Sequence, residues 1–396
     1  MFHKRPSALA HLEPAASLRL SRLSALEAFS RALLVGIVPL IAMDIFGSKE
    51  RVAQVYLVAA ILTTFVTLNV ATLERLLRRR RVVMLAAVLI ILAMLMLASH
   101  HETLLPIGIG LRAAAASLFT VCLSLYIMDH IGKPGLIRAE SRRLQHMGGV
   151  WVIGPLLGSW LFSHSHLSVP FIISGLSALL LLVYFLRLRF GNDQVVVRAR
   201  STASHPLKAV IRYWAQANLR VAYGIVISRS CFWVAIYVYG PIYVIEAGLP
   251  GWVAGAMLSG VSILLFMSPL IARLSDRVGA REVIVIGLLI TGCSTMALGV
   301  LGEPQPYGLI FWITGAMGGV LLDVLGNIPF MRMVDPDDRV AMAGVFSTWR
   351  EGSELVTPLL VTLVLGLALP FVVFYALLGL LHFLAAASTL RLPRRL

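Results

Sequence analysis

The amino-acid sequence predicts an all-α membrane protein in which twelve transmembrane helices form two six-helix pseudo-repeats, with both termini in the cytoplasm. Three observations lead to this fold class: the composition, the number of long apolar segments, and the distribution of arginine and lysine. Of the 396 residues, 59% are hydrophobic and only 13% are charged. Soluble proteins are about half apolar and about a quarter charged, so this chain lacks the polar surface that a water-soluble globule needs.

Twelve segments contain the roughly 20 apolar residues that are needed to cross a hydrocarbon core of about 30 Å. These predicted spans are 23–46, 53–73, 82–99, 104–128, 146–165, 169–186, 221–245, 251–271, 283–301, 307–331, 341–366 and 370–390. If the N-terminus is cytoplasmic, 28 of the 34 lysines and arginines lie in inner segments, four lie inside the spans, and only Lys49 and Arg51 lie in outer segments. This bias fixes the orientation by the positive-inside rule. The net charge of +15 is therefore a topology signal, and we expect no nucleic-acid partner.

The longest inner loop, 187–220, is polar and rich in arginine, and it divides the spans into six and six. We therefore expect an N-terminal bundle over 23–186 and a C-terminal bundle over 221–390, with cytoplasmic tails at 1–22 and 391–396. The first apolar segment is too long for a cleavable signal peptide, so we interpret it as a membrane helix. These features predict a monomeric, multi-pass protein of the bacterial inner membrane, surrounded by the lipid bilayer.

The two halves repeat the same landmarks at a nearly constant offset, which indicates a duplicated six-helix unit. Three pairs of charged residues and the prolines of the first and seventh spans are each 202 residues apart. The pairs are Glu74 with Asp276, Arg75 with Arg277, Arg79 with Arg281, and Pro39 with Pro241. In the fifth and eleventh spans, Pro155 and Pro358 are 203 residues apart.

The stretch from Leu274 to Arg281, LSDRVGAR, resembles the G-x-L-x-D-R-x-G-x-R loop of the major facilitator superfamily, with Ala272 in place of the first glycine. In the first-half copy, Glu74 replaces the aspartate and Leu77 the second glycine. The resemblance covers essentially the whole chain and implies secondary transport by alternating access. It also implies a cytoplasmic gate motif formed by Glu74, Arg75, Arg79, Asp276, Arg277, Gly279 and Arg281.

By this resemblance, Asp276, Arg277 and Arg281 would belong to an ion-pair latch that holds one access state. The alternative is that the basic residues only anchor the inner face, which is the interpretation that we favour for Arg78, Arg80 and Arg81. A second motif, Gly154-Pro155-x-x-Gly158 in the fifth span, is similar to part of a motif found in many proton antiporters of the superfamily.

Ionisable residues inside the predicted spans are the main functional signal, because a charge in the bilayer core costs about 3 kcal/mol or more and normally faces a partner or a wet cavity. In the superfamily, the first, fourth, seventh and tenth helices line the central path, and all four carry such residues here. We expect Asp44 and Asp129, near span ends, to be caps or interface residues. The substrate-binding candidates are Arg31, Arg112, Arg229, Trp233, Asn327 and Arg350. The proton-coupling candidates are Glu27, Asp323, Glu351 and Glu354.

Arg112 and Arg229 have no acidic residue three or four positions away in their own helices. An arginine cannot lose its proton to reduce the cost of burial. Each must therefore meet a carboxylate on another helix, such as Asp323 or Glu351, or an anionic ligand. Glu27 with Arg31 and Arg350 with Glu354 have the i,i+4 spacing of local ion pairs. A carboxylate whose arginine is taken over by a substrate anion would accept a proton, which is a mechanism for coupling.

No phosphate loop, dinucleotide fingerprint, catalytic triad or zinc-protease pattern occurs, so we expect neither an enzyme nor a cofactor. Cys122, Cys231 and Cys293 lack the paired spacing of a metal site or a disulfide framework. The outer-loop histidines His100, His101, His164 and His166 are candidates for a metal site, although exposed loop histidines are common.

Three functions remain in consideration. The first is a proton-coupled transporter of a small organic anion or an anion-bearing metabolite. The second is a drug or metabolite:proton antiporter with a more apolar substrate, which the Gly-Pro motif favours and the four intramembrane arginines oppose. The third is a non-transporting sensor or assembly protein with a transporter fold. A sensor would be expected to carry an added signalling domain, whereas the terminal segments here are short.

Overall fold

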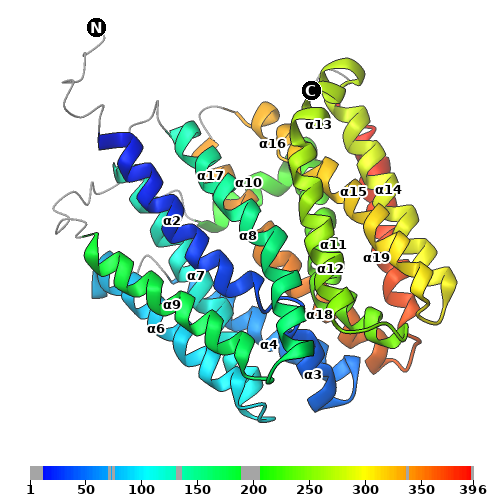
Figure 1. The fold of residues 1–396 in the computed structure, drawn as a ribbon. Helices are drawn as coiled ribbons and strands as arrows, with labels where there is room; N and C mark the ends of the chain where they lie inside the picture. Colours follow the sequence, from blue (N-terminus) through cyan, green and yellow to red (C-terminus); the bar gives the residue numbers. More distant parts are fainter. Residues whose placement is uncertain are drawn as a thin grey trace, which may run out of the picture. The chain divides into compact units, whose positions relative to one another are not determined.

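The computed structural model describes residues 12–69, 73, 76–130, 136–188, 206–335 and 339–393, and all regular secondary structure in these residues is helical (Figure 1). The chain divides into two compact units. The N-terminal unit contains Met1–Gly47 and Val58–Val197, and the C-terminal unit contains Ser48–Leu57 and Arg198–Leu396. The two predicted bundles, 23–186 and 221–390, remain a prediction as transmembrane domains.

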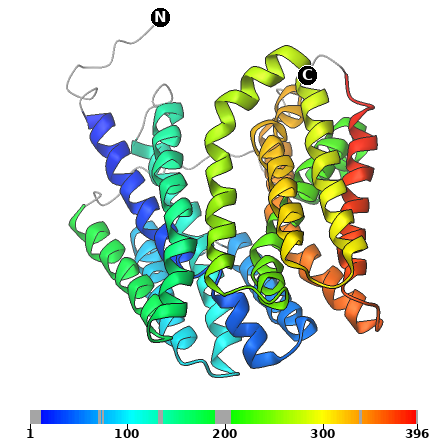
Figure 2. The ribbon, with the colours of Figure 1, turned by 45° about the vertical axis from the view of Figure 1, so that its right-hand side comes forward.

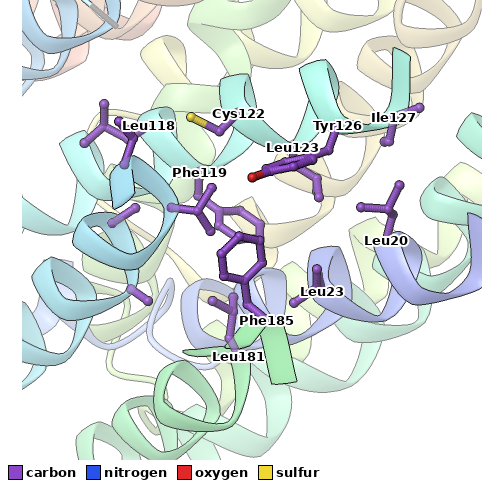
Figure 3. Packing of buried hydrophobic residues seen from close by; sticks show 14 residues of the cluster. Leu20, Leu23, Leu118, Phe119, Cys122, Leu123, Tyr126, Ile127, Leu181 and Phe185 are labelled. Carbon is purple, nitrogen blue, oxygen red and sulfur yellow. The ribbon is translucent and has the colours of Figure 1, made fainter. Parts of the chain in front are cut away.

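The helices of the N-terminal unit pack around an apolar core formed by α2, α6, α7 and α9 (Figure 3). In this core, Phe119 and Tyr126 of α7 are buried with Leu20 of α2 and Phe185 of α9. The rings of Tyr126 and Phe185 meet edge to face with their centroids 5.9 Å apart. The helices are α2 (Leu12–Ala32), α3 (Val38–Phe46), α4 (Lys49–Leu68, which belongs to this unit from Val58 onward), α6 (Arg79–Ala98), α7 (Leu104–His130), α8 (Leu136–His164) and α9 (Val169–Arg187).

In the C-terminal unit, α14 packs between α15 and α19, and α11 packs against α15, α18 and α19 (Figures 1 and 2). Trp312 is fully buried at the centre of an aromatic cluster with Phe232, Tyr243 and Tyr375. The helices are α10 (Pro206–Ala215), α11 (Ala217–Glu246), α12 (Trp252–Ile263), η2 (Leu264–Met267), α13 (Ser268–Val278), α14 (Ala280–Leu301), η3 (Pro306–Gly308), α15 (Leu309–Leu325), α16 (Ile328–Met333), α17 (Arg339–Phe346), α18 (Trp349–Gly366) and α19 (Val372–Thr389).

The first predicted span is not one helix, because α2 ends at Ala32 and α3 begins at Val38. Pro39 lies in the first turn of α3, where its missing N–H costs no hydrogen bond. Inside a continuous helix the same proline would remove a bond and crowd the carbonyl four residues earlier. The seventh span differs, since α11 continues through Pro241.

Three further predicted spans are also interrupted. The span 251–271 becomes α12, η2 and α13, with Pro269 in the first turn of α13. The span 307–331 becomes α15 and α16, with Gly326 and Asn327 between them. The span 341–366 becomes α17 and α18, which begins at Trp349. Helix α10 lies within the loop at 187–220, for which the sequence predicted no helix.

Within the described residues, nine helical segments are long and apolar enough to cross a membrane, and they coincide with nine of the predicted spans. The other three predicted spans, 23–46, 146–165 and 341–366, lie in α2 and α3, in α8, and in α17 and α18. The first of these is divided by the turn after Ala32, and α18 carries three charged residues near its start. The total of twelve spans and the orientation of the termini remain predictions.

The start of α4 belongs to the C-terminal unit through Lys49. Its Nζ lies 2.7 Å from Glu246 Oε2 at the end of α11, and 4.2 Å from the ring centroid of Phe371. Sequence analysis placed Lys49 in an outer loop and assigned it no partner. An ion pair between residues so distant in sequence has no local signal.

Candidate functional site

The C-terminal unit buries one arginine against a carboxylate from another helix. Arg229 of α11 places its Nε 3.3 Å from Oδ1 of Asp323 on α15. Its Nη1 also donates a hydrogen bond to the Leu322 carbonyl oxygen at 3.3 Å. The Arg229 side chain is 5% exposed, whereas that of Asp323 is 28% exposed. Of the two carboxylates that the sequence offered to Arg229, the structure therefore selects Asp323, and that carboxylate is the more open member of the pair.

Gly315 and Gly319 of α15 have the small-residue spacing that allows helices to approach closely beside this pair. A Cβ atom on Gly315 would lie 2.9 Å from the Phe232 ring, and one on Gly319 would lie 3.3 Å from the Trp233 ring. On the other side of α15, a Cβ on Gly318 would lie 2.6 Å from the Gly287 carbonyl oxygen of α14. The backbone of α15 thus lies close to both α11 and α14, and the Trp233 ring of α11 packs on Gly319.

Two guanidinium groups share the indole of Trp349 at the start of α18. The Arg229 Cζ lies 4.7 Å from the ring centroid, and the Arg350 Cζ lies 5.4 Å from it. A tryptophan face attracts cations through its quadrupole, so it stabilises both guanidinium groups. Trp349 is not among the substrate-binding residues predicted from the sequence. Its position next to Arg350, inside a predicted span, was the signal that could have identified it.

The same face of α11 continues from Arg229 to two half-buried aromatic residues at four-residue intervals. Trp233 and Tyr237 stack with their ring centroids 5.8 Å apart and their planes at 24°. Four residues beyond Asp323, Asn327 has a buried Oδ1 with no hydrogen-bond partner in the described part of the chain. The candidate residues Arg229, Trp233, Asp323, Asn327 and Arg350 therefore belong to one unit, on or at the ends of α11, α15 and α18.

The two glutamates of α18 are half-buried. Glu351 interacts electrostatically with the Tyr223 hydroxyl, which lies 3.2 Å from Thr348 Oγ1. Glu354 lies one turn further along α18. Their proposed part in proton coupling remains a prediction.

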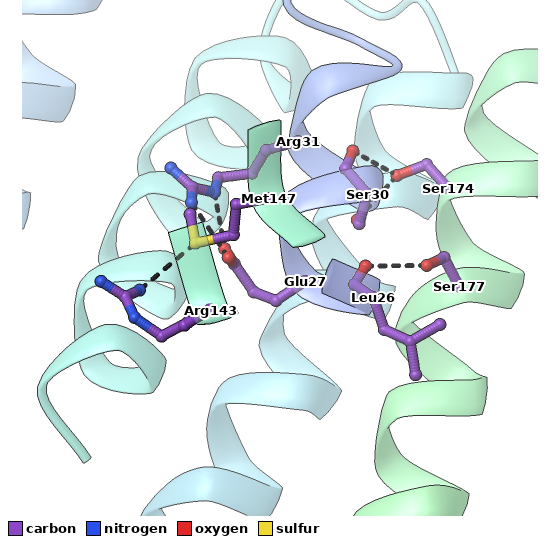
Figure 4. A network of polar contacts seen from close by, with 8 residues as sticks. All are labelled: Leu26, Glu27, Ser30, Arg31, Arg143, Met147, Ser174 and Ser177. Atoms are coloured by element: carbon purple, nitrogen blue, oxygen red, sulfur yellow. Dashed lines mark hydrogen bonds and ion pairs between the residues drawn. The ribbon is translucent and has the colours of Figure 1, made fainter. Parts of the chain in front are cut away.

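In the N-terminal unit, the i,i+4 pair expected between Glu27 and Arg31 is present on α2 (Figure 4). Arg31 Nε lies 2.6 Å from Glu27 Oε1, and Arg31 Nη2 donates to Oε2 at 3.0 Å, so the pair is bidentate. The Glu27 side chain is 3% exposed and that of Arg31 is 31% exposed. The Trp151 ring of α8 lies beneath the guanidinium, 5.9 Å from Arg31 Cζ. Arg143 of α8 bonds to the Met147 sulfur at 3.2 Å.

Small residues bring α8 and α9 against α2 beside this pair. Ser174 of α9 bonds to the hydroxyl and the carbonyl oxygen of Ser30, each at 2.8 Å, and Ser177 donates to the Leu26 carbonyl (Figure 4). On α8, Gly154 and Gly158 of the antiporter-like motif lie against Ala32 and Leu33, where α2 ends. This motif therefore has a packing role.

Arg112 is half-buried on α7 of the N-terminal unit, whereas Arg229 belongs to the C-terminal unit. Asp44 is exposed on α3, and the side chain of Asp129 lies outside the described residues.

The predicted gate motif is described in part, because Glu74 and Arg75 lie outside the described residues. Asp276 and Arg277 are exposed at the end of α13, and Gly279 follows at a φ of 107° that favours glycine. Arg281 donates to the Leu392 carbonyl at 3.1 Å and pairs with Glu282 at 2.8 Å, so it connects α14 to the chain after α19. In the first half, Arg79 Cζ lies 5.4 Å from the Tyr126 ring centroid.

The loop histidines make separate local contacts. His101 Nδ1 is 2.9 Å from Thr103 Oγ1, and His164 stacks on Trp160. Burial lowers the pKa of His100, and the nearby Asp44 carboxylate opposes this shift. Within the described ranges, no group of three His, Cys, Asp or Glu side chains is arranged to hold a metal ion.

Comparisons with known proteins agree on one fold. A sequence model of the Major Facilitator Superfamily matches residues 21–350. A solved structure of a POT family transporter in complex with a thioalcohol-conjugated peptide has a TM-score of 0.74 at 14% identity, covering 95% of each chain. The nucleoside transporter NupG has a TM-score of 0.72 at 13% identity, covering 95% of this chain and 98% of that one. The chain has no significant match among curated protein sequences.

Proposed function

The chain belongs to the Major Facilitator Superfamily, and from this premise we propose that it is a proton-coupled secondary transporter of a small organic anion or an anion-bearing metabolite. Alternating access would arise from the two predicted bundles, 23–186 and 221–390. At 13–14% identity the peptide and nucleoside transporters share the fold with this chain, so the substrate class is inferred from its own residues.

The observation that carries the proposal is the pair of guanidinium groups that lie on the ring of Trp349. Arg229 and Arg350 both lie against its ring, and the carboxylate that pairs with Arg229 is Asp323. A guanidinium binds a carboxylate or phosphate through two parallel hydrogen bonds. An anionic substrate would bind these guanidinium groups, with Trp233 and Asn327 as further contacts. Arg31 and Arg112 would serve the substrate from the N-terminal unit.

Competition between the substrate anion and Asp323 for Arg229 couples substrate binding to proton uptake. An anion that binds the guanidinium displaces the Asp323 carboxylate from its counter-charge, and a carboxylate left in an apolar environment takes up a proton. The 28% exposure of the Asp323 side chain supports this role, because a proton must reach the group. Glu27, Glu351 and Glu354 are the other proton-coupling candidates, of which Glu27 is paired with Arg31.

We propose that the exposed Asp276 and Arg277 take part in a cytoplasmic latch. Asp276→Asn should then reduce transport while expression and detergent stability stay close to wild type. A parallel loss of folded protein and of activity would instead show that the residue is structural.

An antiporter of more apolar substrates is the second candidate, and the observation that favours it is the similarity of Gly154-Pro155-x-x-Gly158 to part of a motif of proton antiporters in the superfamily. The two candidates differ in what should stabilise the protein. Organic acids should raise the thermal stability of an anion transporter, since a ligand at a hundred times its Kd adds about 2.7 kcal/mol. Apolar cations should do so for a drug antiporter.

The decisive experiment uses an organic acid that raises the thermal stability of the protein. Arg229→Lys and Arg112→Lys keep the charge but lose the planar fork, so both should weaken binding of that acid strongly while the protein stays inserted and monodisperse. Asp323→Asn and Glu351→Gln should instead uncouple transport from the proton gradient more than they weaken binding. If both lysine variants bind the acid as tightly as wild type, the arginines are structural and the antiporter becomes the better proposal.

A further inference from the structure

Helix α10 is not used by the proposed transport mechanism, and one of its faces is firmly attached to the protein. Tyr213 is fully buried, and its hydroxyl donates to the Leu219 carbonyl oxygen at 2.9 Å. Its ring also meets the ring of Tyr223 at 6.2 Å. These contacts fix α10 to the start of α11.

The other face of α10 is apolar and exposed. Val210, Ile211 and Trp214 share one side of the helix by their i, i+1 and i+4 spacing. Ile211 is 62% exposed and Trp214 is 44% exposed. The Trp214 ring nevertheless has a fixed neighbour, because it contacts Tyr223 with ring centroids 5.4 Å apart. Trp214 is thus held in place while much of its ring remains uncovered.

The position of α10 along the chain places this face at the membrane boundary. Its last residue is Ala215, and the candidate membrane span of α11 begins at Ala217. Gln216 between them has an extended backbone, with φ −88° and ψ 110°, so the helical path is broken there. An amphipathic helix at the end of a membrane span lies in the interface, where tryptophan is favoured.

The sequence that contains α10 is basic. From Gln194 to Arg220 it has five arginines and lysines and no acidic residue. Arg212 and Arg220 are exposed, and Arg220 Nη1 donates to the Trp214 carbonyl oxygen at 2.7 Å, beside the apolar face. A guanidinium in this position suits the phosphate of a lipid headgroup.

We propose that α10 is a docking surface for anionic phospholipid in the leaflet where α11 begins. Val210, Ile211 and Trp214 enter the headgroup boundary, and Arg212 and Arg220 bind the lipid phosphates. The inference depends on α11 spanning the membrane, and it is independent of the transported substrate and of the side on which α10 lies.

Binding of phosphatidylglycerol and of phosphatidylcholine to the purified full-length protein tests the charged part. The double variant Arg212→Gln/Arg220→Gln should lose affinity for phosphatidylglycerol by about fivefold for each arginine and keep its affinity for phosphatidylcholine. The matched control is Arg273→Gln/Arg391→Gln, which removes two exposed arginines from the same unit. An equal loss in the control, or no loss in the α10 variant, would overturn the proposal.

Fluorescence quenching tests the apolar part without depending on affinity. The difference in emission between wild type and Trp214→Phe is the Trp214 component. Vesicles of phosphatidylglycerol brominated near the headgroup should quench this component. Bromine near the end of the acyl chain should quench this component less. A Trp214 component that bromine does not affect at either depth would show that α10 stays out of the lipid.

Discussion

At the scale of single residues, the best-defined charged group in the described C-terminal unit is the pair of Arg229 and Asp323. The guanidinium is 5% exposed and depends on one carboxylate, one carbonyl and one indole face. A buried ion pair of this kind is costly to break from one side, because the remaining charge keeps its desolvation penalty. Removing both charged groups together costs much less free energy of unfolding. The difference between a single and a double variant therefore measures the interaction.

Asp323→Ala should therefore destabilise the protein by about 3 kcal/mol, since it leaves Arg229 buried without its carboxylate. The double variant Arg229→Met/Asp323→Leu should return to within about 1 kcal/mol of wild type, because it removes both charges. Denaturant titration in detergent measures both values. Glu303→Ala, which removes an exposed carboxylate, is the control. A double variant as unstable as Asp323→Ala would disprove the pairwise account.

The contact between α8 and the end of α2 has no room for a side chain larger than hydrogen at Gly158. A Cβ at this position would overlap the Leu33 carbonyl group, and neither backbone can move away without shifting a helix. Gly158→Ala should therefore cost about 3 kcal/mol or more of unfolding free energy. Gly149→Ala is a matched control on the same helix, since its Cβ would meet nothing within 4 Å. That change should stabilise α8 by roughly 0.5 kcal/mol.

At the scale of elements, the ends and interruptions of helices define where the polar groups lie. Asp323 precedes the interruption between α15 and α16, and Trp349 and Arg350 open α18 after another interruption. The residues that precede α6 and α14 differ. Gly279 precedes α14 at a φ of 107°, whereas Arg78 precedes α6 at a φ of 65°. A side chain at such a φ is strained by about 1–3 kcal/mol.

Arg78→Gly should consequently stabilise the protein by about 1 kcal/mol, although it removes a positive charge from the predicted inner face. Arg80→Gly removes the same charge from the first turn of α6, and should destabilise it by about 0.5–1 kcal/mol. Thermal unfolding of the two variants in one detergent compares them directly. Changes of the same sign would mean that charge, and not backbone conformation, controls this turn.

At the scale of the whole molecule, the distribution of basic residues predicts which segments share one side of the membrane. Lys4, Ser201 and Arg395 lie outside the described residues, but the predicted topology places all three in the cytoplasm. Ser165, between α8 and α9, is predicted to lie on the opposite side.

Single-cysteine labelling tests this topology after replacement of Cys122, Cys231 and Cys293. An impermeant thiol reagent added to intact cells should label Ser165→Cys and spare Ser201→Cys. Permeabilised cells should show labelling at both positions. Labelling of Ser201→Cys from outside would reverse the orientation and, with it, the assignment of the inner connections.

The sequence by itself determined the properties that each segment carries alone. Length and apolarity place the membrane helices, because a segment in lipid must satisfy its own backbone hydrogen bonds. The functional importance of the charges in α11, α15 and α18 could be predicted from the sequence, because the cost of burying a charge is local. The Glu27–Arg31 pair could also be predicted, because its i,i+4 spacing is local. Only the tertiary structure decided that Arg229 pairs with Asp323, that Trp349 contacts two arginines, and that Lys49 pairs with Glu246. The Arg229–Asp323 and Lys49–Glu246 pairs and the Arg229–Trp349 contact join residues from separate helices, and their distances depend on how those helices pack.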